Sequence, residues 1–388
     1  MNIINNKNIF LLLFTSFIAI LAVLSYYTYL SYVDYKYSEN STKGTVLVNK
    51  LNTLLDKLDN ERYESAKYMG TEDATAFSKV KIERKTVDTL IHETEIFTED
   101  NKEFAPNQQN LQSIVKNLKY VRSRVDTLSS DYKNIFFETY HNKIAQPLVN
   151  EINILANKNF SVDIKKDLQI YAGLEKLKEN FRLERAFISY ILSGSKKMNN
   201  QDLLVWDNIL LNNTLPQFDS KSVLISKVKN ALKPELFSKM GSQERAKILH
   251  ASFNGNYAVT NSQWNKIFKK KIDDIELAQK ILFTDIIKRS EDEITEIKNL
   301  IMAYTIGLLF FFFLLLILFF IYRSLNKDKQ LFEDTLKDIE TVLNKDQQKE
   351  LKNLIDKRET TQIYKFLAKT IQEANLAKDL FLANMSHE

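Results

Sequence analysis

The chain has 388 residues, a net charge of +5, seven glycines, four prolines and no cysteine. The absence of cysteine excludes disulfide bridges, thiolate metal sites and a cysteine nucleophile. Basic and acidic residues are interleaved and form no basic stripe with interspersed aromatic residues, which argues against a nucleic-acid-binding protein. So few glycines and prolines leave few turn signals, and the composition favours long helices over a sandwich or barrel.

The first apolar segment, residues 9–30, contains no charged residue and is long enough to cross the hydrocarbon core of a membrane. Tyrosines near its C-terminal end suit the membrane interface. A cleaved signal peptide would have a shorter apolar region and a small-residue cleavage site. We therefore expect an uncleaved transmembrane helix, preceded by a short cytoplasmic N-terminus of residues 1–8.

Residues 31–299 carry apolar residues at helical spacing, beginning with the stripe of Leu51, Leu54 and Leu58. Further helical patterns cover residues 74–97, 108–141, 164–192, 201–212, 221–231 and 262–298. Antiparallel bundles accommodate helices of these lengths with short connections. The segment between the apolar stretches is therefore predicted to be an all-α sensor domain.

One pattern occurs twice in this segment. Two apolar residues four apart precede a Glu-Arg pair, first at Leu54, Leu58 and Glu61-Arg62, and again at Leu177, Phe181 and Glu184-Arg185. The repeat predicts two related helices with an arginine at the same height. Because a guanidinium stays charged when desolvated and presents a planar donor fork, Arg62 and Arg185 are suited to hold one small oxyanion. In the alternative interpretation, both arginines are solvated and pair with nearby carboxylates.

Over about residues 45–297 the segment resembles the nitrate- and nitrite-sensing (NIT) domain. The resemblance rests on the two Glu-Arg helices, Arg84-x3-Asp88 and Trp264-x7-Ile272-Asp273. It implies two stacked four-helix bundles in which arginines bind nitrate or nitrite. The implied ligand-binding residues are Arg62, Arg185 and Arg245, and Tyr63 departs from the family pattern, which has glycine there. The alternative is another helical-bundle sensor, such as a four-helix ligand-binding or chemoreceptor-type domain.

A second charge-free apolar segment, residues 300–322, is followed by Arg323, Lys327 and Lys329. The positive-inside rule places the residues after this segment in the cytoplasm. With two spans, residues 31–299 then lie on the outer side. We therefore expect a multi-pass protein of the bacterial inner membrane with a periplasmic sensor domain.

Residues 323–377 contain neither glycine nor proline. Apolar residues repeat there at 4-3-4 spacing, as in a coiled-coil seam: Phe332, Leu336, Ile339 and Leu343. Such a seam predicts a parallel homodimer. The pattern breaks around residues 344–352, which fits either a plain signalling helix with a stutter or a degenerate HAMP-type relay. The missing proline and glycine of a HAMP domain favour the plain helix.

The run Phe381-Leu382-Ala383-Asn384-Met385-Ser386-His387-Glu388 resembles the phosphoacceptor box of sensor histidine kinases residue for residue. The resemblance implies that residues 378–388 begin a dimerisation and phosphoacceptor domain. It also implies that His387 accepts the γ-phosphate of ATP and that Glu388 orients or deprotonates His387. ATP and Mg²⁺ would belong to a catalytic domain for which residues 1–388 hold no recognisable motif, so we expect these residues to be inactive alone and to hold no cofactor.

Together these features predict a sensor histidine kinase of a two-component system. The expected protein is a homodimer in the lipid bilayer that binds a small anion, nitrate or nitrite first, and transfers a phosphoryl group to a response regulator. The alternative is a chemotaxis-type or other non-kinase receptor with a helical sensor. His92, His141 and His250 show no metal-ligand spacing, so we expect no metal site.

Overall fold

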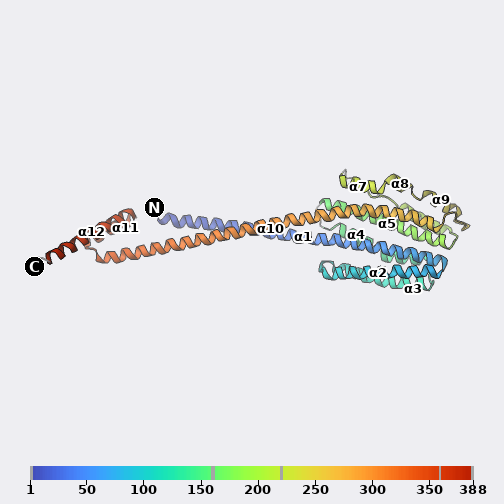
Figure 1. Cartoon of the computed structure of the whole chain (residues 1–388), viewed down its shortest axis with the longest axis horizontal. Helices are drawn as coiled ribbons and strands as arrows, with labels where there is room; N and C mark the ends of the chain where they lie inside the picture. The colour runs from blue at the N-terminus through green and yellow to red at the C-terminus, as the bar shows by residue number, and fades with distance from the viewer. Residues whose placement is uncertain (1–2, 159–161, 219–221, 358–359, 386–388) are drawn as a thin grey trace. The chain divides into compact units, whose positions relative to one another are not determined.

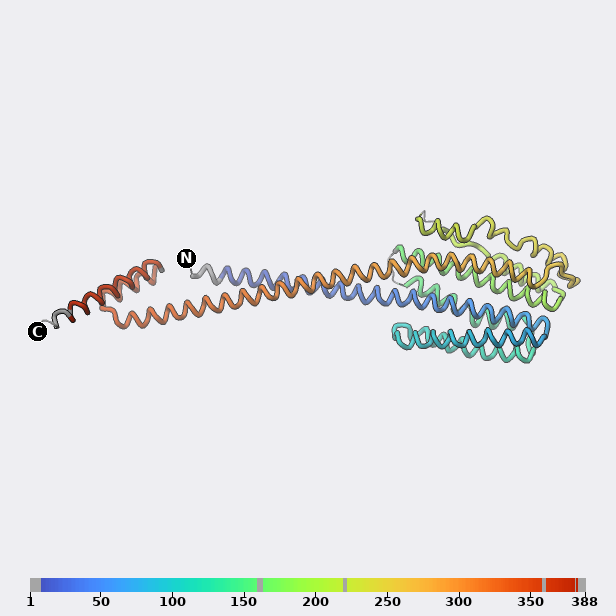
Figure 2. The backbone as a smooth tube through the Cα atoms, in the orientation of Figure 1, coloured from blue at the N-terminus to red at the C-terminus, as the bar shows by residue number. Residues whose placement is uncertain are grey.

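The structure, a computed structural model, describes residues 3–158, 162–218, 222–357 and 360–385. Within these ranges the chain forms helices and no strand, which confirms the predicted all-α fold (Figures 1 and 2). The chain divides into two compact units. Residues 33–298 form the sensor unit, and residues 1–32 together with 299–388 form the terminal unit.

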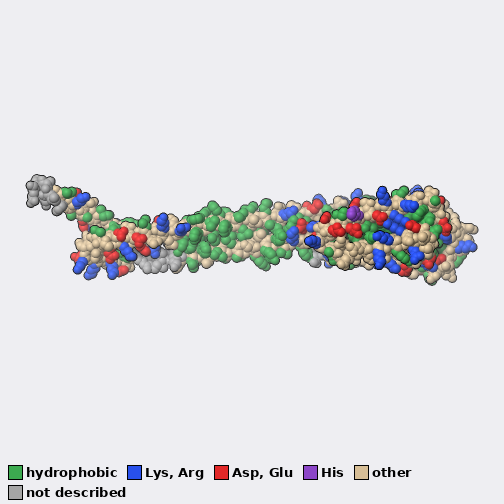
Figure 3. Space-filling model, turned by 90° about the horizontal axis from the view of Figure 1, so that it is seen from below, with side chains coloured by type: hydrophobic (Ala, Val, Ile, Leu, Met, Phe, Trp, Pro, Cys, Tyr) green, Lys and Arg blue, Asp and Glu red, His purple; other side chains and the backbone are tan. Residues whose placement is uncertain are grey.

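Two long helices contribute residues to both units. Helix α1 spans Ile3–Thr71 and helix α10 spans Asn261–Val342. Each contains an 18-residue window of high mean hydropathy, 2.5 in α1 and 2.8 in α10, and is long and apolar enough to cross a membrane. The side chains of these windows are not buried within the protein, and Figure 3 shows a band of hydrophobic side chains on the surface.

Within the terminal unit, the apolar parts of α1 and α10 pack antiparallel. Phe10 stacks on Tyr322 with ring centroids 3.9 Å apart, and the rings of Tyr27 and Tyr304 lie 5.9 Å apart. Early residues of α1 thus contact late residues of α10. The two apolar segments therefore form an antiparallel pair.

The sensor unit combines parts of α1 and α10 with the shorter helices between them. These are α2 (Ala74–Asp100), the 3-10 turn η1 (Lys102–Phe104), α3 (Ala105–Asp126), the π-helix η2 (Lys133–Ala145), α4 (Gln146–Ala156), α5 (Val162–Ser193), α6 (Asn200–Leu211), α7 (Val223–Leu232), α8 (Pro234–Lys239) and α9 (Ser242–Ala251). One continuous hydrophobic core joins these helices. The apolar pattern predicted α2, α5, α6 and α7 but missed α4, α8 and α9.

The helix predicted over residues 108–141 is wrong in one respect, because the structure divides it into α3 and η2. Helix α3 ends at Asp126, and Leu128 adopts a left-handed backbone conformation with φ of 50°. A leucine rarely takes this conformation, so its side chain gave no signal of a break. The following π-helix has wider turns than an α-helix, and such helices often occur at functional sites.

Helices α1 and α5 run parallel and in register. Lys178 contacts Asn52 and Arg185 contacts Asp59, and in both pairs the residue numbers differ by 126. The two helices approach closely at their C-terminal ends, where a Cβ atom on Gly70 would lie 2.8 Å from the carbonyl oxygen of Tyr190. The helix spacing therefore requires a glycine at position 70.

The segment after the second apolar stretch is not one continuous helix. Helix α10 ends at Val342, α11 spans Lys345–Asp356 and α12 spans Thr360–Met385. The side chain of Asn344 accepts a hydrogen bond from the backbone N–H of Gln347 and thereby caps α11. A helix cap thus lies where the apolar pattern breaks, and the choice between a signalling helix and a degenerate HAMP-type relay stays a prediction.

The predicted seam packs within the chain. Leu336 and Leu343 of this seam are buried in a cluster with Leu351, Ile363 and Phe366. These contacts remove from water the apolar side chains whose spacing suggested a coiled coil. The parallel homodimer stays a prediction, and His387 and Glu388 lie outside the described residues.

The close contact of α1 with α5 predicts the effect of adding one methyl group. Gly70→Ala should lower the free energy of unfolding by about 1–3 kcal/mol, because the new Cβ atom meets backbone. Gly44→Ala is the matched control, since its Cβ atom would lie 3.9 Å from the ring of Phe104, and it should be neutral or slightly stabilising. Thermal unfolding followed by circular dichroism measures both. Equal melting temperatures for Gly70→Ala and the wild type would contradict the prediction.

Candidate anion-binding site

Eight charged side chains of α1 and α5 form a buried group, which we call the arginine cluster. Its cations are Arg62, Lys178, Arg182 and Arg185, and its carboxylates are Asp56, Asp59, Glu175 and Glu179. Asp56 has a side-chain exposure of 21%, and the other seven side chains are at most 4% exposed. Four positive and four negative charges balance, as burial of ions requires.

Arg62 of α1 binds a carboxylate of α5. Its Nη1 and Nη2 atoms donate to the two oxygens of Glu179 at 2.7 and 3.1 Å, a bidentate pair. One of these oxygens also lies 2.9 Å from Nδ1 of His141 on η2. Burial tends to raise the pKa of Glu179, but Arg62 and His141 outweigh this effect and lower the pKa to about 2. Glu179 therefore stays ionised and fixes the guanidinium of Arg62.

Asp59 lies among three guanidinium groups. Its Oδ2 atom accepts a hydrogen bond from Nη2 of Arg185 at 2.6 Å and lies 4.0 Å from Nε of Arg182. Its Oδ1 atom lies 3.6 Å from Nη2 of Arg62. The structure thus brings the two predicted arginines, Arg62 and Arg185, to one carboxylate. A planar oxyanion already stands between them, and it is a side chain of the protein.

Tyr63 supports Arg185 from one face. The guanidinium carbon lies 4.8 Å from the centroid of the Tyr63 ring, a cation–π contact. Burial raises the pKa of Tyr63 to about 12, so the phenol stays neutral beneath the cation. The residue that replaces the glycine of the family pattern therefore helps to position an arginine of the cluster.

Arg182 and Lys178 complete the cluster, and neither was identified from the sequence. Arg182 donates to Glu175 at 2.7 Å and to Asp56. The Nζ atom of Lys178 lies 3.0 Å from oxygens of both carboxylates, and two amide side chains accept its remaining hydrogen bonds. Both cations project from α5 toward α1. Only the parallel packing of the two helices makes them neighbours of Arg62.

The arginine cluster contains hydrogen-bond donors without a partner, but only a small cavity. Among the described residues, the buried Nε–H groups of Arg62, Arg182 and Arg185 have no hydrogen-bond partner, and neither has Oδ1 of Asp59. A cavity of about 10 Å³ beside Arg62 has room for roughly one water molecule. An added oxyanion would therefore find hydrogen-bond donors in this cluster, but no room in the present arrangement.

The alternative interpretation of the two arginines is half right. Arg62 and Arg185 do pair with carboxylates, but they are not solvated, because they are only 2% and 3% exposed. A guanidinium held in a desolvated site interacts with an anion more strongly than one in water. Their role in binding nitrate or nitrite stays a prediction.

The glutamates of the two Glu-Arg repeats make equivalent contacts. Glu61 accepts hydrogen bonds from Nε and Nη2 of Arg122 on α3 at 2.8 and 2.7 Å. Glu184 accepts them from Nε and Nη2 of Arg245 on α9 at 2.7 and 2.6 Å. For both repeats the arginine follows the glutamate by 61 residues. Arg122 was not identified from the sequence. The equal spacing of 61 residues between glutamate and arginine in the two repeats would have indicated it.

Arg245 does not join the arginine cluster. Its carboxylate partner is Glu184, which also accepts a hydrogen bond from Nε1 of Trp206 at 2.9 Å. In the part of the chain that the structure describes, Arg245 shares no ion-pair partner with Arg62 or Arg185. Two of the three predicted arginines therefore meet at one place, and the third lies at a separate carboxylate.

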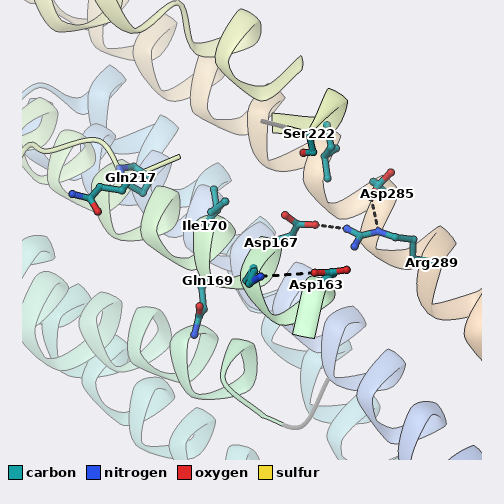
Figure 4. Close-up of a pocket in the computed structure, with 11 residues that line it drawn as sticks. Asp163, Asp167, Gln169, Ile170, Gln217, Ser222, Asp285 and Arg289 are labelled. Carbon is teal, nitrogen blue, oxygen red and sulfur yellow. Dashed lines mark hydrogen bonds and ion pairs between the residues drawn. The ribbon is translucent and has the colours of Figure 1, made fainter. Parts of the chain in front are cut away.

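A wide cleft of the sensor unit does not suit an anion. It has a volume of about 760 Å³ and is lined by residues of α5, α7 and α10 together with Pro216, Gln217 and Ser222. Figure 4 shows that Arg289 in this cleft faces Asp167 and Asp285, both of which accept its hydrogen bonds. Asp163 adds a third carboxylate to the lining. An anion would meet more negative than unpaired positive charge here, so the cleft is a poor match for an anionic ligand.

A buried lysine lies beside the second repeat. Lys271 is 2% exposed, and its Nζ atom lies 4.7, 5.1 and 5.9 Å from the ring centroids of Phe181, Phe237 and Phe268. Burial lowers the pKa of Lys271 to about 8, and repulsion by Arg245 acts in the same direction. The aromatic cage thus holds an amine that loses its proton far more easily than an exposed lysine.

Comparisons with known proteins agree with this architecture. The family model described as nitrate and nitrite sensing matches residues 53–286. The fold is similar to that in the structure of the NasR transcription antiterminator, with a TM-score of 0.52 and 12% identity over 87% of this chain and 95% of that one. At this identity the similarity concerns the fold alone. None of the curated proteins compared with the chain matches it.

The low pKa of Lys271 predicts a rise of stability at alkaline pH. The folded protein releases this proton near pH 8, whereas the unfolded chain keeps it up to about pH 10.5. The unfolded state then binds more protons between these values, so the free energy of unfolding rises with pH there. Lys271→Met should stabilise the protein by roughly 3 kcal/mol at neutral pH and lose this advantage as the pH approaches 10.5.

Thermal unfolding of the wild type and Lys271→Met across this pH range measures the effect. Lys269→Met is the matched control, because Lys269 is an exposed lysine of the same helix, and it should leave the pH dependence unchanged. A stability difference between the wild type and Lys271→Met that does not vary with pH would contradict the assignment.

Proposed function

The chain belongs to the family of nitrate- and nitrite-sensing domains, and on that premise we propose that it is a receptor for nitrate or nitrite. The ligand binds at the arginine cluster between α1 and α5. One observation carries this proposal: Arg62 and Arg185, from the two repeated helices, contact the same planar carboxylate of Asp59. Groups that hold a carboxylate in this way also suit the other small planar oxyanions.

The burial of the cluster supports selectivity for such anions. In a desolvated site the charge interactions are stronger than in water, and a misfit ligand leaves donors unpaired. Nitrate and nitrite carry one negative charge and lie in one plane, so flat guanidinium forks match their shape. A tetrahedral anion such as sulfate carries two charges and cannot lie flat between the forks.

Signal transmission is proposed to follow the two long helices. Both α1 and α10 continue without a break from the sensor unit into the apolar segments. We place these segments in the bacterial inner membrane, with residues 31–299 in the periplasm and the residues after Arg323 in the cytoplasm. A ligand that changes how α1 packs on α5 would then change a helix that enters the membrane.

The proposed output is a histidine kinase. Support comes from the run of residues 381–388, in which His387 would accept the phosphoryl group and Glu388 would orient or deprotonate it. ATP and Mg²⁺ would be bound by a catalytic domain, the protein would act as a homodimer, and a response regulator would receive the phosphoryl group. The second candidate is a non-kinase receptor, because the solved structure with a similar fold is a transcription antiterminator.

Calorimetry of the purified protein in detergent tests the ligand. The wild type should bind nitrate and nitrite, and Arg62→Lys and Arg185→Lys should weaken binding at least about tenfold, because lysine keeps the charge but lacks the planar fork. Arg289→Lys is the control, since Arg289 pairs with Asp167 and Asp285 away from the cluster. The absence of both heat and a thermal shift at millimolar anion would rule out the proposed ligand.

The variant Arg245→Lys tests the third predicted ligand residue in the same titration. Arg245 binds Glu184 at a separate position, so its substitution should weaken nitrate binding less than Arg62→Lys does. An equal loss for both variants would assign Arg245 to the ligand site after all.

Phosphorylation tests the output. In membranes that contain the protein together with its catalytic domain, labelled ATP should give an acid-labile phosphoryl group that His387→Gln abolishes. His250→Gln should keep the label, because His250 is an exposed residue of the sensor unit. Label that survives in His387→Gln would refute the kinase proposal and favour the non-kinase receptor.

A further inference from the structure

We propose that Asp59 is a built-in competitor of the ligand. Its carboxylate occupies the position between Arg62, Arg182 and Arg185 that nitrate or nitrite takes, and the anion binds by displacing it. This inference rests on the proposed function, because it requires a planar oxyanion as ligand. It adds Arg182 to the binding residues and makes Asp59 the group that determines which anions bind and how tightly.

The position of the Asp59 carboxylate is that of a bound oxyanion. It lies 2.6 Å from Arg185, 3.6 Å from Arg62 and 4.0 Å from Arg182, measured between the closest nitrogen and oxygen atoms. A carboxylate and nitrite have the same bent, planar arrangement of two oxygens and the same charge. Donors that are arranged around the one therefore fit the other.

The cluster has no space for Asp59 and a ligand together. The cavity beside Arg62 measures about 10 Å³, which holds roughly one water molecule. Nitrate has four heavy atoms and requires several times this volume. A side chain must leave before the anion enters.

The balance of charge in the cluster also requires that a carboxylate leave when an anion enters. The four cations and four carboxylates of the cluster already cancel. An additional monoanion would leave one uncompensated negative charge in a desolvated place, which is strongly unfavourable. If one carboxylate moves out to water as the anion enters, the charge of the cluster stays at zero.

Asp59 is the least firmly held of the buried carboxylates. Glu179 accepts two hydrogen bonds from Arg62 at 2.7 and 3.1 Å and contacts His141 at 2.9 Å. Glu175 accepts hydrogen bonds from Arg182 at 2.7 Å and from Gln279 at 2.9 Å.

Asp59, by contrast, has one short contact, to Arg185, and its buried Oδ1 atom has no hydrogen-bond partner. Of Asp59, Glu175 and Glu179, Asp59 is therefore the carboxylate whose displacement breaks the fewest hydrogen bonds. Because Asp59 is on α1 and Arg185 is on α5, its release also removes a link between the two helices. Anion binding and the packing of α1 against α5 are thereby coupled.

Titration calorimetry with sodium nitrate and sodium nitrite, at constant ionic strength and with the full chain in detergent, tests the displacement. Asp59→Asn keeps the size of the side chain but removes its charge, so this variant should bind both anions about tenfold more tightly or better. Asp59→Glu keeps the charge on a longer arm and should bind them more weakly than the wild type. These opposite changes follow from competition by the side chain.

Two further variants separate displacement from a general charge effect. Asp56→Asn removes a carboxylate of the same cluster that has no ion pair with Arg62 or Arg185 among the described residues, and it should tighten binding less than Asp59→Asn. Glu103→Gln alters an ion pair with Lys43 outside the cluster and should leave the affinity unchanged. Circular dichroism and thermal unfolding establish that each variant is folded.

The possible results distinguish the inference from the proposed function. Equal or weaker binding by folded Asp59→Asn overturns the inference, and so does an equal gain for Asp56→Asn and Asp59→Asn. If Asp59→Asn does not fold, the weaker binding predicted for Asp59→Glu decides the question, and unchanged or tighter binding by that variant overturns the inference. A wild type and variants that all give no heat remove the proposed function itself.

Discussion

The balance of buried charge between α1 and α5 is the constraint on which the sensor unit depends. Arg62, Arg182 and Arg185 are almost fully removed from water, and each requires a carboxylate nearby. Any anion that enters must therefore exchange with a negative charge that the protein already holds. The same constraint links binding to conformation, because the negative charges belong to the two helices that the cations join.

The helical scaffold places these charges with little freedom. Helices α1 and α5 run parallel, and their close approach at Gly70 fixes the distance between them. On the outer sides, the glutamates of the repeat bind arginines of α3 and α9. The glutamate of each repeated helix thus binds a helix that follows it in the chain, α3 in the case of α1 and α9 in the case of α5. Arg62 and Arg185, in contrast, each contact the other repeated helix. This division explains how adjacent residues of one motif make two different kinds of contact.

The sequence could predict the fold class and part of the site. Helical periodicity and two apolar segments were sufficient for an all-α protein, and duplication along the chain identified Arg62 and Arg185 as equivalent positions. The roles of Asp59 and Glu179 depend on the register in which α5 packs on α1, which no local pattern encodes. The break between α3 and η2 escaped detection for a related reason, since Leu128 adopts its left-handed conformation without a glycine or proline to indicate it.

The most direct test of this account is a high-resolution structure of the protein determined with and without nitrite. With nitrite, a bent, planar anion should lie between Arg62 and Arg185, and the Asp59 carboxylate should have moved away from Arg185. Without nitrite, Asp59 should remain bound to Arg185 at 2.6 Å. Nitrite bound at another position, with the contact between Asp59 and Arg185 intact, would contradict the account.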